Sequence, residues 1–109
     1  AQEGHGDDIN AINIERLQTN IERILYHTTL SRDELEKEFG RIESPNQVMI
    51  RKLLVLPNRF SRKVLGSRKR KAMLFCHPDH FADNPKRQEM AELLFKIINN
   101  GAEELGRYL

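Results

Sequence analysis

Apolar residues recur at spacings of three and four along almost the whole chain, and no stretch alternates strictly between apolar and polar residues. The first pattern places apolar side chains on one face of a helix, whereas strict alternation is typical of a half-buried strand. With 109 residues, the chain has little room for a second hydrophobic core. These features predict one small all-α domain.

Residues that favour helix ends divide this pattern into separate helices. The first helix is expected from about Asp8, as its N-cap, to about His27. Ser31 and Glu34 form a capping box that opens a short second helix. Gly40 is a natural end for that helix, because glycine favours the position just past a helix C-terminus.

Prolines set the limits of the next two helices. The third helix is expected to begin with Ser44 as its N-cap and Pro45 in its first turn. It must end before Pro57, whose ring cannot continue a helix. A fourth helix is expected from Ser61, its N-cap, to about Phe75.

A loop over residues 77–85 follows, and a last helix comes after it. The apolar positions of that helix recur at helical spacing and are Ala91, Leu94, Phe95, Ile98, Ala102 and Leu105. Because the loop is short, the fourth and last helices should lie antiparallel as a hairpin with their apolar faces together.

The charge of the chain is unevenly distributed, although its net value is only +2. Residues 1–44 hold five basic and ten acidic residues, residues 45–85 hold nine basic and two acidic residues, and residues 86–109 hold four of each. The fourth helix contains no acid, and its basic residues, expected to face mostly outward, are Arg62, Lys63, Arg68, Lys69, Arg70 and Lys71. An acidic partner, whether protein, nucleic acid or membrane surface, is the natural complement.

The tripeptide His77-Pro78-Asp79 stands between this basic helix and the last apolar helix. In this setting the sequence resembles the J domain, the DnaJ-type co-chaperone module that stimulates ATP hydrolysis by seventy-kilodalton heat-shock (DnaK-type) chaperones. Leu53-Leu54-Val55-Leu56 stands where that family usually has Ile-Leu-Gly-Val. Lys71-Ala72-Met73-Leu74 is similar to the auxilin branch, and Leu56-Pro57 is similar to J domains of viral tumour antigens. The resemblance covers residues 46–109.

The resemblance implies a DnaK-type chaperone as partner and a set of residues that would contact it. In J domains the tripeptide engages the interface between the chaperone's nucleotide-binding domain and its linker, while basic residues of the preceding helix meet an acidic surface. Carried onto this chain, the partner-binding residues are His77, Pro78, Asp79, Arg62, Lys63, Arg68, Arg70 and Lys71. The hydrolysing residues belong to the partner, so this chain is expected to be an activator and not an enzyme.

Two departures from the family bear on the strength of stimulation. His80 stands where the family usually has Lys, and Lys69 replaces the buried Tyr of the basic helix. The stem of Lys69 is expected to lie across the edge of the core while its ammonium group reaches water.

The resemblance divides the chain into an acidic helical extension, residues 1–43, and a J domain, residues 44–109. The extension either packs on the core and enlarges its interior, or forms an adaptor, a client contact or an autoinhibitory cover over the basic helix. Which of these holds is left open by the sequence.

Other interpretations of the motifs remain. The tripeptide could be an ordinary helix-ending turn in which Asp79 caps the next segment. The basic helix could belong to a degenerate J-like scaffold that binds nucleic acid or an acidic protein without stimulating a chaperone. Nucleic acid is the less favoured partner, since aromatic residues make up only 6% of the chain and no nucleic-acid-binding fold is recognised.

No cofactor or metal is expected. Cys76, His77 and His80 lack the fourth ligand that a structural zinc site usually needs. Cys76 is the only cysteine and falls on the apolar face of its helix, so a buried, inert thiol is expected. A lone cysteine, with no apolar run of membrane-spanning length and no signal peptide, favours the cytoplasm, with the nucleus also open.

Overall fold

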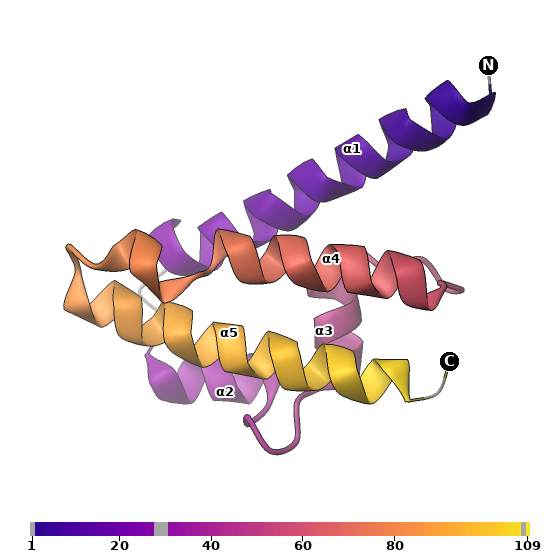
Figure 1. The fold of residues 1–109 in the computed structure, drawn as a ribbon. Helices are drawn as coiled ribbons and strands as arrows, with labels where there is room; N and C mark the ends of the chain where they lie inside the picture. The colour runs from indigo at the N-terminus through magenta and orange to yellow at the C-terminus, as the bar shows by residue number, and fades with distance from the viewer. Residues whose placement is uncertain (1, 28–30, 108) are drawn as a thin grey trace.

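The structure, a computed structural model, describes residues 2–27, 31–107 and 109, and the side chains of these residues except those of 2–10 and His27. It consists of five α-helices with two short helical turns between them (Figure 1). In chain order the elements are α1 (Gln2–Glu22), the π-helix η1 (Arg23–His27), α2 (Arg32–Phe39), α3 (Gln47–Leu53), α4 (Arg62–Phe75), the 3-10 helix η2 (Pro78–Phe81) and α5 (Pro85–Gly106). Apart from one isolated bridge between Gly40 and Pro45, the described residues form no β-structure, which confirms the all-α class.

Helices α4 and α5 lie side by side and run antiparallel, joined by the short connection that contains η2 (Figure 1). Helix α1 packs against α4, whereas α2 and α3 pack against α5. The connection at residues 77–85 therefore lies at one end of a helical hairpin, with η1 close beside it.

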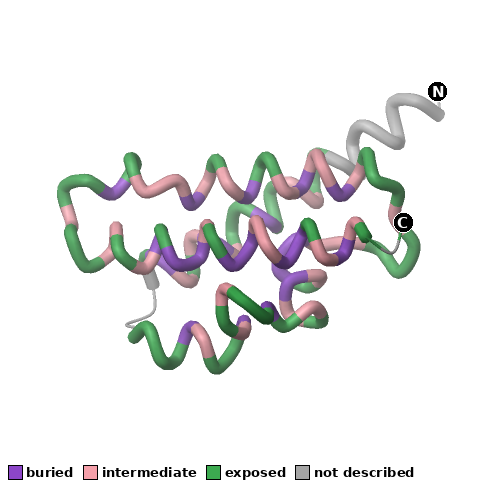
Figure 2. The backbone as a smooth tube through the Cα atoms, turned by 60° about the horizontal axis from the view of Figure 1, so that its bottom comes forward, coloured by how far each residue is buried: buried purple, intermediate pink, exposed green. Residues whose placement is uncertain are grey.

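One hydrophobic cluster joins all five α-helices, and its buried residues line the sides on which the helices face one another (Figure 2). Leu17 and Ile21 of α1 are fully buried in it, together with Ile50 of α3 and Leu94 of α5. Burial of a leucine or isoleucine side chain contributes about 1.5–3 kcal/mol. Helix α1 of the N-terminal extension therefore contributes side chains to the hydrophobic core.

Two predicted helix starts differ from the structure. The backbone is already helical from Gln2, so Asp8 lies within α1 and does not cap it. Helix α3 has Asn46 as its N-cap in place of Ser44, because the side-chain oxygen of Asn46 accepts from the Met49 N–H at 3.3 Å. The Asn46 N–H donates to the Phe39 carbonyl at 2.8 Å, which holds Pro45 in an extended bridge opposite Gly40 and delays the helix.

Other predicted boundaries are confirmed. Ser31 and Ser61 cap α2 and α4, each through a side-chain oxygen that accepts a backbone N–H three residues on. Gly40 ends α2 with a φ of 86°, a conformation that glycine adopts without steric cost. The first helix changes from α to π geometry at Arg23, a change that residue spacing did not indicate.

Two glycines within helices give a testable contrast. A Cβ atom built on Gly101 would lie 2.9 Å from Cγ1 of Ile50, so only glycine lets α3 and α5 approach this closely. A Cβ atom on Gly66 would meet its nearest neighbour, an Arg70 guanidinium nitrogen, at an ordinary 3.5 Å.

We expect Gly66→Ala to raise the free energy of unfolding by about 0.5–1 kcal/mol, because alanine loses less backbone entropy in a helix. Gly101→Ala should lower it by about 1–3 kcal/mol through overpacking against Ile50. Urea unfolding followed by circular dichroism measures both. A destabilised Gly66→Ala variant would contradict this account of α4.

Candidate functional site

Helix α4 carries an exposed basic side that leads toward the tripeptide. Arg62 and Lys63 are exposed in its first turn, and Arg70 and Lys71 are exposed near its end. Lys63 and Arg70 are seven residues apart and so lie on the same side of the helix, and the tripeptide begins two residues after the helix ends at Phe75. We call Arg62, Lys63, Arg70 and Lys71 the basic face.

Arg68 does not belong to this face, which corrects the expectation that it faces outward. Its residue is only 4% exposed, because it shares the buried side of α4 with Leu65 and Ala72, three residues before and four after it. Its Nη1 atom donates to the carbonyl oxygens of Leu54 at 3.1 Å and Val55 at 2.6 Å. Desolvation lowers the pKa of Arg68, but its ordinary value is so high that the guanidinium keeps its charge.

Lys69, which stands where the J-domain family has a buried Tyr, is partly buried. Its side chain is 27% exposed, and its Nζ atom lies 4.0 Å from Oε1 of Glu103 on α5. The ammonium group therefore faces the second helix of the hairpin and not the open side of α4.

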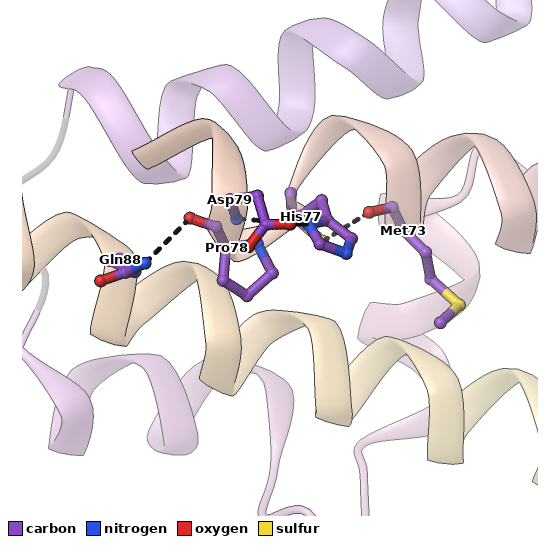
Figure 3. Close-up of polar contacts among 6 residues, drawn as sticks. Met73, His77, Pro78, Asp79 and Gln88 are labelled. Atoms are coloured by element: carbon purple, nitrogen blue, oxygen red, sulfur yellow. Dashed lines mark hydrogen bonds and ion pairs between the residues drawn. The ribbon is translucent and has the colours of Figure 1, made fainter. Parts of the chain in front are cut away.

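The backbone of the tripeptide forms the start of η2. Pro78 occupies the first turn, where its missing N–H is not needed, and His77 is the N-cap. Nδ1 of His77 accepts from the Asp79 N–H at 3.2 Å. Helix α5 holds the turn from the other side, since Nε2 of Gln88 donates to the Pro78 carbonyl at 3.4 Å (Figure 3) and the Phe95 ring meets the His77 ring edge-on with centroids 5.6 Å apart.

The carboxylate of Asp79 is free to meet a partner. Its side chain is 87% exposed, and Oδ2 lies 3.6 Å from Nδ1 of His77. Nδ1 accepts the Asp79 N–H, so in a neutral imidazole it has no proton to donate to that carboxylate. The tripeptide thus offers an open acceptor on a turn whose backbone is fixed.

Capping roles around the tripeptide belong to other residues than Asp79. Asn84 caps α5, with its side-chain oxygen accepting from the Arg87 N–H at 3.1 Å. His77 caps η2. The interpretation of Asp79 as a helix cap is therefore wrong, because its side chain points to solvent.

The N-terminal extension reaches the same end of the hairpin through η1. The Tyr26 ring lies 5.5 Å from the ring of Phe81, the buried last residue of η2. The Arg87 guanidinium lies 4.8 Å over the Tyr26 ring, and its Nε donates to the Leu25 carbonyl at 2.8 Å. The turn is therefore contacted from two sides: η1 packs on Phe81, and α5 contacts His77 and Pro78.

Cys76 directly precedes the tripeptide and is fully buried. Burial raises the pKa of its thiol to about 12, so the nucleophilic thiolate is scarce near neutral pH. Its Sγ atom faces the Met73 carbonyl at 4.0 Å. No group of three or more His, Cys, Asp or Glu side chains in the described part of the chain could hold a metal ion.

We expect Cys76 in the folded protein to react with a maleimide at least about a hundredfold more slowly than in urea, because both access and thiolate are lost on burial. The reaction should stay slow up to pH 9, since thiolate forms only as the pH approaches the raised pKa of about 12. Rapid labelling of the folded chain at pH 7 would show that the thiol is accessible.

Val55, which accepts from Arg68, has an unusual backbone conformation. Its φ is 53°, in the left-handed region that β-branched residues rarely adopt. The turn is closed by two backbone bonds, from the Val55 N–H to the Lys52 carbonyl at 3.1 Å and from the Leu56 N–H to the Arg51 carbonyl at 3.0 Å, and Arg68 binds its outward carbonyls.

At Val55 we expect glycine to be more stable than alanine by about 0.5–1 kcal/mol, because relief of left-handed strain exceeds the entropy cost of glycine. At position 66, by contrast, alanine is expected to be more stable than glycine. Urea unfolding of Val55→Gly and Val55→Ala measures the difference, and a more stable alanine variant would show that Val55 is not strained.

Within the part of the chain that the structure describes, no helix is both long enough and apolar enough to cross a membrane. No family model, curated protein or solved structure matches this chain.

Proposed function

We propose that this chain is a J-domain co-chaperone that binds a DnaK-type chaperone and stimulates its ATP hydrolysis. The observation that carries the proposal is the exposed Asp79 carboxylate, presented on a fixed turn at the end of the basic face. The resemblance in the residues around the tripeptide supports the same function.

The geometry suits docking to a partner. An exposed carboxylate can accept two parallel bonds from an arginine of the partner, which gives direction as well as energy. The four side chains of the basic face add attraction to an acidic surface over a longer range. Arg68 has no part in this contact, because its guanidinium is bound inside the fold.

Stimulation requires that the chain bind the hydrolysis-competent state of the chaperone more tightly than the other state. A fixed turn strengthens this binding, since little conformational entropy is lost on docking. Contacts from Gln88, Phe95 and, through Phe81, Tyr26 are what fix it.

We expect the wild-type chain to accelerate single-turnover ATP hydrolysis by a DnaK-type chaperone, and His77→Gln and Asp79→Asn to lose about tenfold or more of this effect. The reason is that a hydrogen bond to a charged group contributes about 1.5–3 kcal/mol. Asp83→Asn is the matched control, since it removes an exposed acid from the same connection outside the tripeptide.

Charge reversal at Arg70 and Lys71 separates the two parts of the site. It should weaken binding and reduce its salt dependence, without abolishing stimulation at saturating concentration. Absence of stimulation by the folded wild-type chain with several DnaK-type chaperones would overturn the proposal. Binding of nucleic acid that depends on the basic face and not on Asp79 would then assign the chain to the rival class, a basic scaffold.

A further inference from the structure

A surface trough lies between α1 and α3, on residues that neither the tripeptide nor the basic face uses. One hollow of about 500 Å³ is bordered by Ile12 and Arg16 of α1 and by Lys52 and Val55 at the end of α3. A second hollow of about 320 Å³ shares Lys52 and Val55 and continues past Val48. We call the two together the α1–α3 trough.

Apolar side chains border both hollows. Ile12 on the first hollow is 52% exposed and Val48 on the second is 61% exposed, and both are among the large apolar side chains that the fold leaves uncovered. Val55 borders both hollows, Leu56 borders the second, and both residues are partly exposed. Apolar groups gathered in one hollow, rather than scattered singly, are typical of a contact surface.

Among the described residues that border the trough, cations outnumber acids. Arg16 and Arg23 of the N-terminal segment and Lys52 of α3 are exposed on the rim of the first hollow, and Glu15 is the one acid among its described lining residues. The ion pairs within 4.0 Å that the described side chains form do not include these three cations. Arg51 adds a fourth positive charge in the second hollow, where it donates to the Asn58 carbonyl at 3.1 Å.

Val55 is the apolar residue that the two hollows share. Its φ of 53° belongs to the end of α3, where the Val55 N–H donates to the Lys52 carbonyl at 3.1 Å and the Leu56 N–H donates to the Arg51 carbonyl at 3.0 Å. Glycine is the usual residue at such a helix end, and here a β-branched apolar side chain stands at the junction of the two hollows.

We propose that the α1–α3 trough binds an acidic peptide segment of a partner protein. Apolar side chains of the peptide pack on Ile12 and Val55, and its carboxylates pair with Arg16 and Arg23. These arginines are seven residues apart, about 10 Å along the helix axis, so the carboxylates must have a similar spacing. That spacing corresponds to acids about three residues apart in an extended peptide or seven apart in a helical one.

This inference is independent of the proposed chaperone function, because the two sites share no residue. The trough brings together the N-terminal extension and the segment at the end of α3, so it exists only in the assembled fold. A client or adaptor held there would leave the tripeptide turn open.

The test uses fluorescein-labelled peptides of about 15 residues, each with two glutamates at spacing three, four or seven and leucines between them. Scrambled peptides of the same composition are the matched controls. We expect wild-type protein to bind one spacing class by anisotropy, more weakly at high salt. Arg16→Glu with Arg23→Glu should weaken that binding at least about tenfold, because it replaces two attractive charge contacts with repulsive ones.

Two further variants make the result specific. Val55→Gly removes the apolar centre while relieving backbone strain, so it should stay folded by circular dichroism and still weaken peptide binding about threefold or more. Arg70→Glu with Lys71→Glu makes the same charge change on α4 and should weaken binding far less.

Several outcomes would overturn the proposal. They are the absence of binding by every spacing class up to millimolar concentration, equal binding of scrambled peptides, and equal losses from the α1 and α4 charge reversals. Binding of a single-stranded oligonucleotide that is tighter than peptide binding and equally dependent on Arg16 and Arg23 would assign the trough to phosphate and overturn it as well.

Discussion

Much of this fold depends on two hydrogen bonds that the buried guanidinium of Arg68 donates to carbonyl oxygens at the end of α3. It connects the third and fourth helices where Leu54 caps α3 and Val55 turns the chain with a positive φ. Bonds to a charged donor are about twice as strong as neutral ones, and the two made by Nη1 offset part of the cost of burying this cation, whose Nε has no partner among the described residues. One side chain thereby fixes the turn, the approach of α4 and the position of Val55 in the trough.

Apolar residues of the acidic extension are part of the hydrophobic core, and this changes how its charge should be understood. Leu17, Ile21 and Leu25 supply buried surface to the same cluster that holds the hairpin together. Attachment by apolar packing is insensitive to ionic strength, unlike a cover held by charge. The basic face of α4 is exposed, and Tyr26 of the extension contacts Phe81 of η2.

Local chemistry explains which features could be predicted from sequence. The caps at Ser31 and Ser61, the end at Gly40 and the buried thiol of Cys76 depend on neighbouring residues or on spacing. These features could therefore be predicted from the sequence. The helix start at Asn46 depends on a bond to Phe39, and the inward turn of Arg68 depends on carbonyls that only the tertiary fold brings near. The π-helix likewise has no local cause in sequence, whereas the positive φ of Val55 has one, because Val55 follows the C-cap of α3 at the position where the resemblance has a glycine. Of the candidate site, the exposed positions of Asp79 and the basic face followed from the pattern, whereas the supports from Gln88 and Tyr26 did not.

The bond from Arg87 to the Leu25 carbonyl spans 62 positions in the chain, and the bond from Asn100 to the Ile42 carbonyl spans 58. Such contacts cannot form until the residues between them have been synthesised, and closing long loops first costs chain entropy. During translation α1 therefore leaves the ribosome well before α5, the helix that completes its surroundings. Helices α1 and α4 or α2 and α3 can already pair before α5 is made, but the contacts of α5 with α2, α3, α4 and η1 must wait for it.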